Sequence, residues 1–130
     1  MKTVKNLVQI YKKMNKLDRA EFFSLKLLKF SANENGENNL ETVKIVSSLA
    51  ILLKKQNKFE SSEEMYVRAL KGYEEAYGVE SKEYLSILNN LGILYKSMEK
   101  PVQCREMYDR ALEGRLALLG TKMKNCEFYL

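Results

Sequence analysis

The sequence predicts an all-α protein, an α-α superhelix of three helical hairpins plus a C-terminal helix. The first observation is internal repetition, because Leu7, Leu49 and Leu91 lie 42 residues apart and begin similar patterns. Residues 47–78 and 89–120 are identical at 13 of 32 aligned positions. The second observation is that apolar residues recur at helical spacing in each copy, whereas no segment alternates like a strand. Such a chain stacks its copies into one core and commonly displays a continuous binding surface.

The chain is expected to form a single domain over residues 1–130, because its length suits one core. Three copies of the repeat follow one another, and each reads as two helices joined by a short turn. The expected bounds are about 4–36 for copy one, 43–78 for copy two and 85–120 for copy three, followed by a terminal helix over about 122–130.

Helix-breaking residues recur at the same step. Residues 56–58 (Gln-Asn-Lys) are expected to separate the two helices of copy two. Pro101, the only proline, is expected to begin the second helix of copy three, where its missing N–H is tolerated. Gly36, Gly78 and Gly120 are expected to end the second helices, where a residue with positive φ is needed.

Composition narrows the classes of function. Histidine is absent, which removes the commonest general base and metal ligand, so neither a catalytic site, a cofactor nor a metal site is predicted. The two cysteines show no disulfide or zinc spacing, and neither a secretory signal nor a membrane span is recognisable, so a cytoplasmic location is expected. The net charge of +5 favours an anionic partner.

The repeated strings identify a family resemblance. They are Leu-Asn-Asn-Leu-Gly-Ile-Leu-Tyr at residues 88–95 and Glu-Met-Tyr-Asp-Arg-Ala-Leu at 106–112, matched in copy two by residues 48–53 and 64–70. They resemble the tetratricopeptide repeat, and the 42-residue step is similar to that of the kinesin light chain type. The resemblance implies helical hairpins that stack into a solenoid, with the first helix of each copy lining a concave groove. In the kinesin light chain family, this groove takes cargo peptides that carry an aromatic residue flanked by acids.

Small residues fall at equivalent positions of the copies. Ala50 and Gly92 lie on first helices, and Ala20, Ser62 and Cys104 lie on second helices. Two helices of one copy can approach closely only where a side chain is small, so we expect close packing at these positions. Cys104 is therefore interpreted as a small core residue and not as a reactive thiol.

Helical spacing then indicates which residues of the first helices face the groove. They are, in chain order, Lys2, Lys5, Asn6, Gln9, Lys12, Lys13, Lys44, Ser47, Ser48, Ile51, Lys54, Lys55, Ser86, Asn89, Asn90, Ile93, Lys96 and Ser97. Eight of these eighteen are lysines and none is acidic, which predicts a protein-interaction scaffold that binds an acidic peptide segment of a partner protein. Asn6, Asn89 and Asn90 match the family motif and suit the backbone of an extended peptide.

Other interpretations stay open at this point. The lysines also fit an ordinary solvated face. Nucleic-acid binding is disfavoured, because aromatic residues are not interleaved with the lysines as a stacking platform requires. A fragment of a larger regulatory protein that dimerises through its ends is a further alternative, since Phe128, Tyr129 and Leu130 are apolar for an outermost element. An enzyme is the least supported class.

Overall fold

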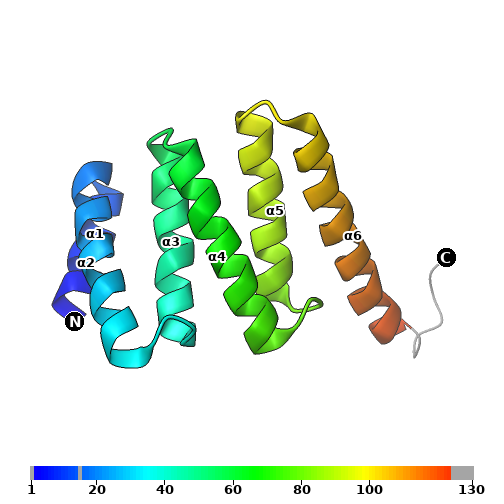
Figure 1. Ribbon diagram of the computed structural model, residues 1–130, viewed down its shortest axis with the longest axis horizontal. Helices are drawn as coiled ribbons and strands as arrows, with labels where there is room; N and C mark the ends of the chain where they lie inside the picture. Colours follow the sequence, from blue (N-terminus) through cyan, green and yellow to red (C-terminus); the bar gives the residue numbers. More distant parts are fainter. Residues whose placement is uncertain (1, 15, 124–130) are drawn as a thin grey trace. The chain divides into compact units, whose positions relative to one another are not determined.

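The computed structural model describes residues 2–14 and 16–123, and these form six α-helices and no strand (Figure 1). The predicted all-α class is therefore confirmed. The helices are α1 (Lys2–Lys13), α2 (Leu17–Asn35), α3 (Leu40–Lys55), α4 (Phe59–Tyr77), α5 (Lys82–Ser97) and α6 (Pro101–Met123). Each copy contributes one hairpin, and Pro101 begins the second helix of copy three as expected.

The chain divides within α4 into two compact units, Met1–Gly72 and Tyr73–Leu130. The first unit holds α1, α2, α3 and most of α4, and α2 packs against both α1 and α3. The second unit holds the end of α4 with α5 and α6, which pack on each other. Each unit is described by itself below, and the single domain expected from chain length stays a prediction.

The turns inside the hairpins of copies two and three use one backbone arrangement. Asn57 and Glu99, at equivalent positions, both adopt a left-handed conformation, with φ of 63° and 58°. The amide that follows each of them donates to a carbonyl five residues back, Lys58 to Leu53 and Lys100 to Tyr95, at 2.9 Å in both cases. This is the Schellman arrangement, which satisfies carbonyls left free at a helix end.

Glu99 is poorly suited to this turn, because the left-handed conformation costs free energy for a residue with a Cβ, and the cost is smaller for asparagine. Replacing Glu99 with asparagine should raise the free energy of unfolding by about 0.5 kcal/mol, and Glu99→Gly by up to about 1 kcal/mol. Urea denaturation measures both changes. Asn57→Glu is the matched control and should lower the midpoint; equal stability of all three variants would contradict the argument.

Close approach between the helices of a hairpin occurs at the small residues. Ser62 is fully buried on α4, and its hydroxyl donates to the Ala50 carbonyl of α3 at 2.7 Å. In copy three, a Cβ added to Gly92 would lie 2.8 Å from the ring of Tyr108, so only glycine fits without a shift. The close packing predicted at Ala50, Ser62 and Gly92 is confirmed.

The ends of the hairpins agree with expectation in two copies out of three. Gly36 and Gly78 follow α2 and α4 with φ of 93° and 88°. In copy three, however, α6 continues through Gly120 to Met123. The predicted break at Gly120 is therefore wrong, since a glycine weakens a helix interior without ending it when no turn follows. Lys122, expected to begin a terminal helix, belongs to α6, and residues 124–130 of that expected helix lie outside the described residues.

Candidate functional site: a hollow among α1, α2 and α3

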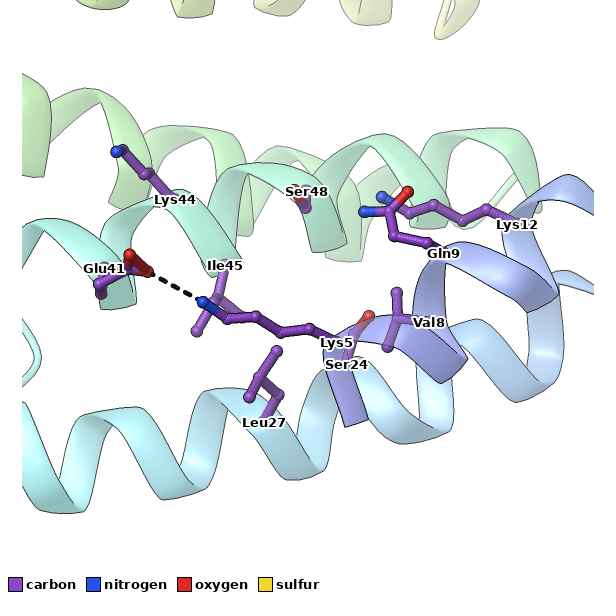
Figure 2. A pocket seen from close by; sticks show the side chains of 10 residues that line it. All are labelled: Lys5, Val8, Gln9, Lys12, Ser24, Leu27, Glu41, Lys44, Ile45 and Ser48. Atoms are coloured by element: carbon purple, nitrogen blue, oxygen red, sulfur yellow. Dashed lines mark ion pairs between the residues drawn. The ribbon is translucent and has the colours of Figure 1, made fainter. Parts of the chain in front are cut away.

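The first unit contains a hollow of about 170 Å³ among its first three helices (Figure 2). Five residues of the predicted groove contribute to its wall. The lining residues are Lys5, Val8, Gln9, Lys12, Ser24, Leu27, Glu41, Lys44, Ile45 and Ser48. A cavity of about 150 Å³ lined by apolar side chains can hold a benzene molecule, so this hollow is large enough for the ring of one phenylalanine side chain.

The floor of the hollow is apolar and buried. Val8, Leu27 and Ile45 are only 5%, 7% and 8% exposed, and they come from α1, α2 and α3 respectively. Ser24 of α2 is 3% exposed and lies beside them. No hydrogen bond between described residues involves its hydroxyl, so this group is available to an occupant of the hollow.

The hollow lies in copy one because one residue there differs from its equivalents in the other two copies. Ser24 is equivalent to Tyr66, which is buried in copy two, and to Tyr108, whose ring lies against Gly92 in copy three. In copy one, the hydroxymethyl group of Ser24 replaces that ring. Val8 and Leu27 are larger than their counterparts and fill part of the space, and the remainder stays open.

Charge is distributed unequally around the rim. At one end, Nζ of Lys5 lies 3.5 Å from Oε2 of Glu41, and both side chains are about half exposed. At the other end, Lys12 is half-buried, and its pKa is lowered by burial and by the positive charge of Lys55. No ion pair among the described residues involves Lys12 or Lys55. An anion that reaches this end therefore relieves a repulsion that the free protein carries.

Lys12→Gln should raise stability while it weakens the binding of acids. Because the folded-state pKa of Lys12 is lowered, its charge costs folding free energy at neutral pH. This cost begins to fall as pH rises through the lowered pKa and is gone above the ordinary pKa of lysine. After allowance for solvent screening, the expected gain in the free energy of unfolding at pH 7 is small, below about 1 kcal/mol. Urea denaturation at pH 7 and pH 10 measures it. The difference between variant and wild type should shrink at pH 10, and a destabilised variant would contradict the argument.

The remaining predicted residues do not line this hollow. In the first unit, these are exposed or half-buried positions of α1 and α3: Asn6, Lys13, Ser47, Ile51, Lys54 and Lys55. In the second unit, all lie on α5 and are likewise exposed or half-buried: Ser86, Asn89, Asn90, Ile93, Lys96 and Ser97. Lys2, the last of the predicted residues, begins α1. Ile51 and Ile93 are both 38% exposed, which is unusual for large apolar side chains at equivalent positions.

Several residues of the hollow were missed from sequence. Glu41 is an acid within a rim that was expected to be basic only. The signal for the floor was present, because the alignment of the copies already places serine at position 24 against two tyrosines. The approach of Glu41 to Lys5 had no such signal, since it depends on how α1 and α3 pack across copies.

Cys104 lies in a second hollow, on α6, and is half-buried instead of belonging to the core. Lys96 lines the same hollow with Glu99 and Asp109, so this lysine has acidic neighbours. Among the described residues, no group of His, Cys, Asp and Glu is arranged to hold a metal ion. No helix in the part of the chain that the structure describes has both the length and the apolar character needed to cross a membrane.

A family model of the tetratricopeptide repeat matches residues 42–81 and 85–122, which is more than half of the chain. The chain belongs to the tetratricopeptide repeat family. Members of this family generally mediate protein–protein interactions and are typically non-catalytic scaffolds. A comparison with curated proteins gave no match.

Among solved structures, the tetratricopeptide repeat chain is similar to the crystal structure of BtubC (BKLC) from P. vanneervenii. The two share 32% sequence identity with a TM-score of 0.81. The match covers 85% of this chain and 44% of that chain, so this chain spans less than half the length of BtubC. The predicted solenoid fold and the kinesin light chain-like repeat type are confirmed by this neighbour.

Proposed function

We propose that this tetratricopeptide repeat protein is an interaction scaffold that binds an acidic peptide segment of a partner protein in the cytoplasm. The observation that carries the proposal is the hollow among α1, α2 and α3, where Lys5, Lys12 and Lys44 surround a buried apolar floor. This combination suits a peptide that inserts one apolar side chain and places carboxylates beside it. The exposed pair Ile51 and Ile93 suits further apolar contacts.

The proposal extends over all three copies through equivalent positions. Lys54 and Lys96 occupy the same register on α3 and α5 as Lys12 does on α1. Asn89 and Asn90 on α5 offer amide groups to a peptide backbone, as the family motif implies. Lysines supply long-range attraction, and the asparagines and isoleucines fix the bound segment.

Two synthetic peptides test the proposal. The Phe peptide carries one phenylalanine between glutamates on both sides, and the Ala peptide replaces that phenylalanine with alanine. Titration by fluorescence anisotropy at low salt should show tighter binding of the Phe peptide, with affinity falling as salt rises. A single-stranded oligonucleotide of equal charge is the comparison. Equal or tighter binding of the oligonucleotide would favour a nucleic-acid-binding repeat and overturn the proposal.

Self-association is a second candidate function that one observation favours. Ile10 of α1 is 49% exposed, whereas its equivalents Leu52 and Leu94 are completely buried. An apolar position that is covered in two copies and open in the third suits contact with another helix, here from a second copy of the chain. Light scattering should then show a mass that rises with concentration, and Ile10→Glu should abolish the rise. A monomer at every concentration would exclude this candidate.

A further inference from the structure

The two ends of the hollow among α1, α2 and α3 differ in their charge. Figure 2 shows the Lys5 amine, Glu41 and Lys44 at one end and Lys12 with Gln9 at the other. The buried apolar side chains of Val8, Leu27 and Ile45 line the same hollow. A bound peptide that spans the hollow therefore presents its flanking groups to two different environments.

Glu41 is held at the first end by the local structure of α3. The Asn39 side chain caps the helix by accepting a hydrogen bond from the Glu41 amide at 2.9 Å. A carboxylate in the first turn of a helix is stabilised by the helix dipole, so Glu41 is favoured there even without Lys5. Its Oε2 lies 3.5 Å from Nζ of Lys5 and offsets the charge of that amine in the free protein.

The second end has the opposite character. Lys12 is half-buried next to Lys55, with no ion pair to either amine among the described residues. A carboxylate gains the full attraction of an uncompensated amine here, whereas at Lys5 it must first replace Glu41. The gain at Lys5 is therefore reduced by the loss of an existing pair.

We propose that Glu41 is a specificity-determining residue, which occupies the place of a ligand carboxylate at Lys5, so that Lys12 selects for acid more strongly than Lys5 does. The inference rests on the proposed function and deepens it, because it states which of the two amines, Lys5 or Lys12, selects an acidic side chain beside the bound apolar residue. Removal of the Glu41 carboxylate makes both ends selective. In the wild type, by contrast, a ligand carboxylate at Lys5 only exchanges the Glu41–Lys5 pair for a ligand–Lys5 pair.

A double-mutant cycle with the Phe peptide tests the proposal. Lys5→Gln and Lys12→Gln are each made in wild type and in Glu41→Gln, and the dissociation constants are measured at one low salt concentration. In wild type, Lys12→Gln should weaken binding about five- to tenfold, and Lys5→Gln less than about twofold. Glu41→Gln alone should tighten binding about two- to fivefold. In the Glu41→Gln background, Lys5→Gln should cost about as much as Lys12→Gln.

Glu37→Gln is the matched control for net charge. It removes one carboxylate from the same unit. In the wild type, Oε1 of Glu37 lies 3.7 Å from a guanidinium nitrogen of Arg68, and neither residue lines the hollow. Equal affinities of Glu37→Gln and Glu41→Gln, or an equal cost of Lys5→Gln with and without Glu41, would overturn the inference and leave the proposed function standing. Failure of the wild-type protein to bind the Phe peptide at low salt would overturn both.

Discussion

Replacing Lys12, Lys54 and Lys96 with glutamate is expected to weaken binding of the Phe peptide at least about a hundredfold. The three lysines occupy equivalent positions on the first helices of the three copies. Each replacement removes an attraction and adds a repulsion, and each such change in a charged contact is worth about 1 kcal/mol when the group is partly exposed. Anisotropy titrations over a range of salt concentrations measure the effect, which should shrink at high salt.

The matched control places the same charge change on second helices. Lys29, Lys71 and Arg115 are all exposed on α2, α4 and α6. Their triple replacement with glutamate changes the net charge equally and should weaken binding by a few-fold only, through reduced long-range attraction. Equal losses in both triple variants would attribute the effect to net charge alone. Full binding by the Lys12, Lys54 and Lys96 variant, with the helical content intact, would show that the first helices are the wrong surface.

Filling the hollow with Ser24→Phe is expected to raise stability and to remove the preference for the Phe peptide. The added ring resembles the tyrosine of the other copies and buries apolar surface over Val8, Leu27 and Ile45. It also replaces a hydroxyl that makes no hydrogen bond among the described residues. Burial on this scale contributes about 1–2 kcal/mol to the free energy of unfolding. Urea denaturation measures the gain.

Val8→Ala is the opposite change in the same place. It enlarges the hollow and should lower the free energy of unfolding by about 1 kcal/mol. In binding, Ser24→Phe should give equal affinities for the Phe and Ala peptides, whereas Val8→Ala should keep the preference for the Phe peptide. Retained discrimination by a stable, folded Ser24→Phe variant would show that the phenylalanine is bound elsewhere.

Features set by local chemistry were predictable from the sequence. Three kinds of feature each follow from the backbone preference of one residue type. They are the hairpin turn at residues 56–58, the start of α6 at Pro101, and the ends of α2 and α4 at Gly36 and Gly78. Gly120 failed as a helix end, because glycine permits a positive φ but does not impose it. Helix starts fell two or three residues earlier than expected, since polar first turns carry no apolar periodicity.

The candidate site was less accessible to sequence reasoning. Helical spacing placed Lys5, Gln9 and Lys12 on one face of α1, which depends on local geometry alone, and all three line the hollow. The floor depends on side-chain volumes at three positions considered together, and the pairing of Glu41 with Lys5 depends on packing between copies. Neither can be obtained from the periodicity of a single helix.

The missing ring at position 24 has a thermodynamic consequence for copy one. With an open space beneath α1 and with Ile10 at its surface, the first hairpin has less apolar burial than its counterparts. Local opening of α1 therefore costs less free energy than opening of α3, and its backbone amides should exchange with deuterium sooner. A molecule that occupies the space supplies the absent contacts, so its binding should slow the exchange of the α1 amides.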